Sequence, residues 1–181
     1  MEPATGRTLR GKWIWLALAA LIVAADLWSK QAVFERLPER GVEWIAGEWF
    51  GFTKVRNTGM MWGKFQGMAE VLRWLRLGAA LVVLWMLVNT PARQRLLLLA
   101  LGLVLGGALG NIYDGFAFGW VRDFLLFDFD FPPFDPFPVF NVADSAICVG
   151  VGLLALGLLF DGQGQESGAT APGRDEAARL S

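Results

Sequence analysis

Histidine is absent from this chain of 181 residues, and cysteine occurs once, as Cys148. The missing histidine excludes catalytic triads with a histidine base and histidine-ligated metal sites, and a single cysteine excludes an internal disulfide. Charge is also scarce, since charged residues make up 18% of the chain, with 16 basic residues against 17 acidic ones. A net charge of −1 provides no basic field for DNA or RNA, so we expect no nucleic-acid partner.

Hydrophobic residues, in contrast, form 55% of the chain, and the mean hydropathy is +0.44. Nine Trp and 14 Phe accompany a single Tyr. Such an aromatic set is typical of proteins that lie at the boundary between water and hydrocarbon. The composition therefore indicates a membrane protein and excludes a disordered chain.

Four apolar segments have lengths close to that of a membrane-spanning helix. They cover residues 13–34, 68–88, 96–112 and 142–160. The first also fits a signal peptide, because basic residues precede a short apolar run and Ala24-Ala25 resembles a cleavage site. Three further spans, and a helical pattern that continues through Trp28, favour a membrane helix instead.

Basic residues near the span ends predict the orientation of the chain. Lys and Arg precede the first span, and Arg93 and Arg95 occupy the short loop between the second and third spans, whereas the loop before the fourth span carries only Arg122. We therefore expect a multi-pass protein with both termini in the cytoplasm. The predicted parts are a basic N-terminus (1–12), a four-span domain (13–160) with outer loops 38–67 and 114–140, and a disordered tail (161–181).

Both outer loops are rich in aromatic residues. Two short aromatic and β-branched runs, 43–50 and 51–55, predict a small sheet on the outer leaflet. In the second loop, Phe and Asp alternate, which would direct aromatic rings toward lipid and carboxylates toward water. The predicted fold is an all-α membrane protein with four transmembrane helices and a small β-rich periplasmic element.

Ionisable residues in or beside membrane spans are costly, so they mark candidate functional positions. Asp26 and Lys30 are four residues apart, which places them on one helix face where they can pair. Two other polar stripes end on the outer side, formed by Gly107, Asn111 and Asp114 and by Asn141, Asp144 and Cys148.

Asp123 follows the third span and Asp144 lies just inside the fourth, so a helical hairpin can bring both to one depth at the outer surface. Two carboxylates in one site do not both ionise readily, so one keeps its proton while the other can take a proton from a water between them. This arrangement suits aspartic peptide hydrolysis, in which no covalent intermediate forms.

Other chemistries have weaker support. Ser29 and Lys30 are adjacent, about 100° apart around a helix, and do not readily form a Ser-Lys dyad. Ser145 could still meet Lys30 from another helix. Clustered Asp residues could bind a hard cation, but their spacing matches no known loop. A small transporter or ion-relay protein is also compatible with intramembrane charges, although a relay would spread carboxylates through the membrane depth.

Four motifs occur in order along residues 13–160. They are DLWSK (26–30), NTGMMWG (57–63), GGALGNIYDG with GWVRDFL (106–125), and FPVFNVADSAICVG (137–150). Together they resemble the bacterial lipoprotein signal peptidase (signal peptidase II) family, which consists of four-helix membrane aspartic peptidases.

The resemblance implies a catalytic pair, Asp123 and Asp144. It also implies substrate-binding or supporting roles for Asp26, Lys30, Asn57, Gly59, Asn111, Asp114 and Asn141. The implied activity removes the signal peptide from prolipoproteins, before a diacylglyceryl-modified cysteine, without a metal or organic cofactor. By this resemblance we expect a monomer in the cell inner membrane whose active site lies at the outer face, in contact with lipid and with lipid-modified prolipoprotein.

Two positions depart from the family pattern. Gly115 stands where the family usually has Arg, and Met61 stands where it usually has Ala. Loss of the Arg removes a bidentate donor that could hold a substrate carbonyl or lipid headgroup and orient its neighbouring carboxylate. We expect Arg122, next to Asp123, to compensate as a supporting residue. An inactive homologue that serves as a membrane scaffold stays open as an alternative.

Overall fold

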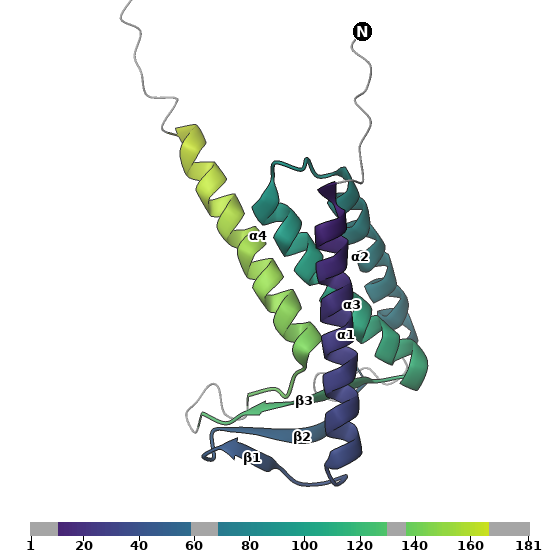
Figure 1. Cartoon of the computed structure of the whole chain (residues 1–181). Coiled ribbons are helices and arrows are strands. Elements are labelled where there is room, and N and C mark those ends of the chain that lie inside the picture. The colour runs from purple at the N-terminus through teal and green to yellow at the C-terminus, as the bar shows by residue number, and fades with distance from the viewer. Residues whose placement is uncertain (1–10, 59–68, 130–136, 167–181) are drawn as a thin grey trace, which may run out of the picture.

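The computed structural model describes residues 11–58, 69–129 and 137–166, and its helices stand above a small sheet (Figure 1). The helices are α1 (Trp13–Arg36), α2 (Ala69–Asn89), α3 (Arg95–Phe118) and α4 (Val142–Glu166). The strands are β1 (Glu43–Ala46), β2 (Phe50–Asn57) and β3 (Val121–Phe127).

Within the described residues, three helices are long and apolar enough to cross a membrane. They are α1, α3 and the Glu70–Asn89 part of α2, whereas the apolar stretch of α4, Val142–Gly157, is shorter. The helical membrane character predicted from the sequence is therefore confirmed, and the number of four spans stays a prediction. Helix α1 also continues without interruption through Ala24 and Ala25.

Helix α3 is the most buried of the three and contacts each of the other helices. Glycines make this close packing possible. A Cβ atom added to Gly106 would lie 2.8 Å from the carbonyl oxygen of Ala19 in α1. One added to Gly107 would collide with the carbonyl oxygen of Ala143 in α4. Small residues thus let the backbones of α1 and α4 approach α3 from two directions.

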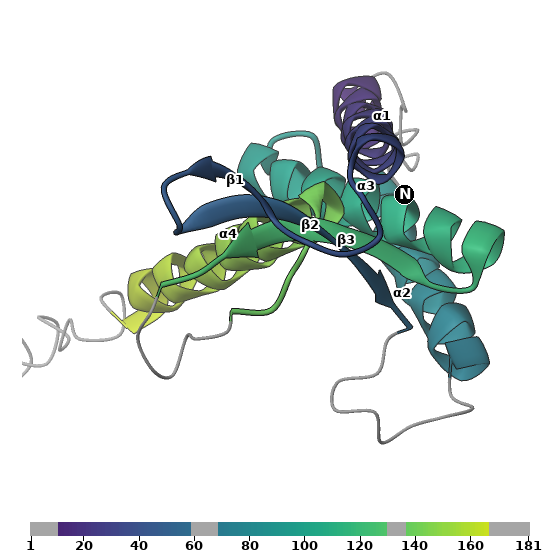
Figure 2. The ribbon, with the colours of Figure 1, turned by 90° about the horizontal axis from the view of Figure 1, so that it is seen from below.

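The sheet is antiparallel with the strand order β1-β2-β3. Strand β3 lies within the predicted outer loop 114–140, so that loop contributes a strand to the small sheet predicted from residues 43–55. Figure 2, viewed from the sheet end, shows β3 in front of α3, and these two elements are in contact. Figure 1 shows the start of α1 and the described end of α4 at the opposite end of the molecule.

Two predicted boundaries were wrong. Helix α3 ends at Phe118 instead of Ile112, so it contains Asp114, as the polar stripe predicted, and the outer loop begins later than residue 114. The helix ends where Gly119 adopts a left-handed conformation with φ of +80°, which its missing side chain permits. Helix α4 continues to Glu166, so residues 161–166 are helical instead of disordered.

Candidate active site

Hydrogen bonds between β3 and the segment before α4 bring the two candidate catalytic aspartates together. The backbone nitrogens of Phe124 and Leu125 both donate to the carbonyl oxygen of Phe140, at 2.9 and 2.8 Å. The backbone nitrogen of Phe140 donates in return to Leu125, at 3.1 Å. Since Asp123 directly precedes this pairing and Asp144 lies in the first turn of α4, the two acids face one small region.

Asn141 connects the two aspartates. Its side-chain Nδ2 donates to Oδ1 of Asp123 at 2.6 Å, and its backbone nitrogen donates to Oδ2 of Asp144 at 3.2 Å. Its Oδ1 in turn accepts the backbone N–H of Asp144 at 2.9 Å. These reciprocal bonds three residues apart cap the start of α4, in the manner of a capping box. Local helix capping therefore fixes Asp144 relative to Asp123.

Each carboxylate also accepts a hydrogen bond from the amide side chain of a second residue. Nδ2 of Asn57, at the end of β2, lies 2.8 Å from Oδ2 of Asp123. Nδ2 of Asn111, in α3, lies 2.7 Å from Oδ1 of Asp144. Asp123 is buried, whereas Asp144 is half-buried. The two acids thus have similar partners but different access to water.

Burial raises the pKa of Asp123 from its ordinary value of 3.8 to about 6. The negative charge of Asp144 acts in the same direction, while the hydrogen bonds from Asn57 and Asn141 and the charge of Lys30 oppose it. A pKa this close to neutrality suits a group that gives and takes a proton during a reaction.

The predicted pairing of Asp26 with Lys30 is confirmed, and it belongs to a larger buried cluster. Nζ of Lys30 lies 2.6 Å from Oδ2 of Asp26 and 3.3 Å from Oδ2 of Asp114. It also donates to Oδ1 of Asn111 at 3.0 Å. The ammonium of Lys30 thereby holds the side-chain oxygen of Asn111, so that Nδ2 of Asn111 faces Asp144. Lys30 and the amide thus link the ion cluster to the aspartate pair.

Arg122 contacts Asp114, with Nη2 2.7 Å from Oδ1 of the carboxylate. Gly115 has no side chain that could supply a guanidinium there. A Cβ atom added to Gly115 would have only Cγ of Arg73 within 4 Å, at an ordinary contact distance of 3.9 Å. The guanidinium next to Asp114 therefore comes from β3 and not from position 115, the next residue of α3. Gly59 and Met61, also singled out in the sequence, lie outside the described residues.

The contacts oppose the Ser-Lys alternative. The hydroxyl of Ser145 donates to the carbonyl oxygen of Asn141 at 3.0 Å, and that of Ser29 donates to the carbonyl oxygen of Asp26 at 2.9 Å. Lys30 instead interacts with carboxylates and an amide. For the metal alternative, the residues that the structure describes contain no group of three or more Cys, Asp or Glu side chains suited to an ion.

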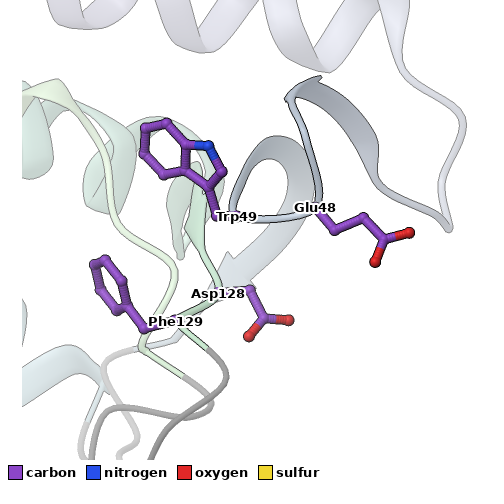
Figure 3. A pocket seen from close by; sticks show the side chains of 4 residues that line it. All are labelled: Glu48, Trp49, Asp128 and Phe129. Carbon is purple, nitrogen blue, oxygen red and sulfur yellow. The ribbon is translucent and has the colours of Figure 1, made fainter.

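Two hollows on the surface lie apart from the aspartate pair. One, of about 440 Å³, is lined by Glu48, Trp49, Asp128 and Phe129. Figure 3 shows the two aromatic side chains on one side of it and the two carboxylates directed away from them. The other, of about 260 Å³, lies between α1 and the sheet and includes Phe124. Neither hollow is lined by Asp123 or Asp144.

The apolar helices, the polar groups gathered at one end of them and the small sheet define a helical membrane protein with a buried polar site. Two solved structures, both described as bacterial membrane enzymes, share this fold with a TM-score of 0.73 and 24% sequence identity. The similar regions cover 82% and 81% of this chain and 88% and 92% of those chains.

The family described as Signal peptidase (SPase) II matches residues 18–160, and the chain belongs to this family. A lipoprotein signal peptidase of Alteromonas mediterranea is 34% identical, over 87% of each chain. One of Pseudomonas putida is 37% identical, over 86% of this chain and 91% of the relative. A lipoprotein signal peptidase of Anaeromyxobacter is 36% identical, over 92% of this chain and 95% of the relative. The resemblance seen in the sequence is confirmed. The family and these names support a peptidase that removes signal peptides from prolipoproteins.

Proposed function

We propose that Asp123 and Asp144 are the catalytic pair of this peptidase, and that it cleaves lipid-modified prolipoproteins before the diacylglyceryl cysteine. The observation that carries the proposal is the contact of one residue, Asn141, with both carboxylates. Paired acids held by neutral amides can share one proton, whereas acids paired with cations would both stay ionised.

The difference in burial between the two acids supports a separate role for each of them in this proposal. Asp144, half-buried at a helix N-terminus that stabilises negative charge, is the base that takes a proton from water. Asp123, buried and with a pKa raised to about 6, is the acid that donates its proton to the scissile carbonyl oxygen. The water oxygen then bonds to the carbonyl carbon, and a tetrahedral diol forms.

Collapse of this diol completes the reaction and restores both acids. Asp144 gives its proton to the amide nitrogen as the carbon–nitrogen bond breaks, and one diol hydroxyl returns a proton to Asp123. Asn57 and Asn111 hold the carboxylates in place while these protons move. Each proton is accounted for, and no covalent enzyme adduct or metal is required.

The arrangement of the elements supports a protein with four membrane spans and both termini in the cytoplasm. The start of α1 and the described end of α4 lie at the end opposite the sheet (Figure 1). The sheet and the aspartate pair would then lie at the outer face of the inner membrane, where water is available and where the exposed rings of Trp44 and Trp49 can contact lipid. A single chain supplies both acids and their amide partners, so we expect a monomer to suffice.

A cleavage assay tests the substrate class. Purified protein would be given a diacylated precursor peptide and, separately, the same peptide without lipid, with the Asp144→Asn variant as the inactive reference. We expect kcat/KM for the lipidated peptide to exceed that for the peptide without lipid by at least about 100-fold, because binding of the lipid chains, remote from the scissile bond, contributes to the rate. Equal turnover of the two peptides would contradict the proposed specificity, and turnover of neither would indicate an inactive homologue.

A further inference from the structure

The side chain of Arg122 is buried against α3 and α1, although its neighbour Asp123 belongs to the candidate active site. Nε of Arg122 lies 3.1 Å from Oδ1 of Asp114, and Nη2 lies 2.7 Å from the same oxygen. Nη1 donates to Oε1 of Gln31 at 3.1 Å. The guanidinium also lies over the ring of Phe118, 4.6 Å from its centroid. All three guanidinium nitrogens therefore have a partner within the protein.

The backbone of Arg122 also forms hydrogen bonds within the protein, through both its N–H and its carbonyl oxygen. Its N–H donates to Oδ2 of Asp114 at 2.9 Å, and its carbonyl oxygen accepts a long hydrogen bond of 3.4 Å from Nδ2 of Asn141. One carboxylate thus accepts hydrogen bonds from both the backbone and the side chain of the same residue. The next residue along the chain is Asp123, so these contacts restrict the direction of its carboxylate.

Charges of alternating sign extend from α1 through α3 to β3. Asp26, Lys30 and Asp114 are 0% exposed, and the side chain of Arg122 is 5% exposed. Two negative and two positive groups leave this row of charges neutral, and each charge has an opposite partner. Removing one partner would leave a buried charge uncompensated. Strand β3 is therefore fixed to α3 through a contact that has little freedom to shift.

We propose that Arg122 is a positioning residue: its contact with Asp114 fixes β3 on α3 and sets the direction of the Asp123 carboxylate, and its buried guanidinium serves this contact within the protein and not the substrate. This inference rests on the proposed function, because it requires that Asp123 acts in catalysis. Of the roles expected for an arginine at position 115, it gives Arg122 the orientation of a carboxylate and not the donation to a substrate.

Steady-state kinetics with the diacylated precursor peptide can separate positioning from substrate binding. We expect Arg122→Gln to lower kcat about 100-fold and to leave KM within about twofold, because a misdirected catalytic group slows the chemical step. Arg122→Lys keeps the charge but not the paired donors, so it should lose about tenfold in kcat. The double variant Asp114→Asn/Arg122→Gln should be no slower than the slower single variant, since both changes break one contact.

Arg56→Gln is the matched control. Arg56 pairs with Arg122 across β2 and β3 but is 59% exposed, and its replacement should change kcat by less than about twofold. Thermal unfolding in detergent reports whether each variant folds. Where Arg122→Gln does not fold, Arg122→Lys provides the test.

The possible results separate this inference from the proposed function. A raised KM with unchanged kcat in the Arg122 variants would overturn the inference and assign the residue to substrate binding. Additive losses in the double variant, or an unchanged kcat, would also overturn it. Failure of the wild-type protein to cleave the peptide would defeat the proposed function itself, whereas normal wild-type turnover combined with a pure KM effect would defeat only the positioning role.

Discussion

Nδ2 of Asn141 lies 2.6 Å from Oδ1 of Asp123. The same residue caps the helix that carries Asp144, through a hydrogen bond from its backbone N–H to that carboxylate and one from the backbone N–H of Asp144 to Oδ1. A single neutral residue therefore holds a strand and a helix in a fixed relation, and it does so without adding a charge that would force both acids to ionise.

Replacing Asn141 should slow catalysis and weaken the fold together. We expect Asn141→Ala to lower kcat at least about tenfold, because Asp123 and Asp144 lose their common partner, and to cost about 1–3 kcal/mol of stability through the lost hydrogen bonds. Cleavage kinetics and thermal unfolding in detergent measure the two effects. Asn89→Ala, at the far end of α2, is the matched control and should keep full activity. Equal kinetics for the two variants would exclude the role given to Asn141.

The rate should depend on the protonation of Asp123. Burial, aided by the charge of Asp144, raises the pKa of this acid to about 6. Because the acid must be protonated to donate, kcat/KM should fall as pH rises through about 6, and it should approach a tenfold decrease per unit above about pH 7. The measurement is a kcat/KM profile from about pH 5 to about pH 8. A flat profile across this range would contradict the assignment of Asp123 as the acid.

Lys30 forms ion pairs with two buried carboxylates, and it is the cation that Asp26 depends on, so its loss should be costly. We expect Lys30→Met to destabilise the protein by about 3–5 kcal/mol, since Asp26 then lacks its cation. The double variant Asp26→Asn/Lys30→Met should recover part of this loss because it removes the uncompensated charge. Chemical denaturation in detergent measures the free energy of unfolding of the single and the double variant. A double variant less stable than Lys30→Met alone would show that the pair is not coupled in this way.

The packing of α1 on α3 should tolerate no side chain at Gly106. An added Cβ would lie 2.8 Å from the carbonyl oxygen of Ala19, so Gly106→Ala should push the two helices apart and cost about 1–3 kcal/mol. In contrast, an added Cβ at Gly78 in α2 has no neighbour within 4 Å, and Gly78→Ala should be neutral or slightly stabilising. Thermal unfolding in detergent compares the melting temperatures of the Gly106→Ala and Gly78→Ala variants. Similar melting temperatures for both variants would contradict the close approach.

Local patterns in the sequence predicted much of the fold. The helices follow from apolar runs, and the contact between Asp26 and Lys30 follows from their spacing of four residues on one helix. The aspartate pair was predicted from its depth at the ends of two spans, and the family resemblance named the amides around it. These features depend on residues that are close in sequence or on a shared motif.

Contacts between distant segments were not predictable in this way. Strand β3 forms because it pairs with β2, and the bond from Asn57 to Asp123 joins residues 66 positions apart. The partner of Arg122 depends on where α3 ends, because that helix continues beyond its apolar run to Phe118, where the left-handed Gly119 terminates it. Gln31 was missed for the same reason, since its bond to Arg122 spans 91 positions. A polar residue directly after Lys30 was the only signal for it.

Asparagine variants of the two proposed catalytic aspartates test the central proposal most directly, when they are compared with an asparagine variant of a carboxylate outside the pair. Asp128 follows β3 and provides that control. The measurement is single-turnover cleavage of the diacylated precursor peptide by each purified variant, with folding checked by thermal unfolding.

We expect Asp123→Asn, Asp144→Asn and the double variant to lose at least about 10³-fold in rate, with the double no worse than either single, because the two acids act as one unit. Asp128→Asn should cleave at close to the wild-type rate. Substantial cleavage by either folded single variant would contradict catalysis by the pair of Asp123 and Asp144.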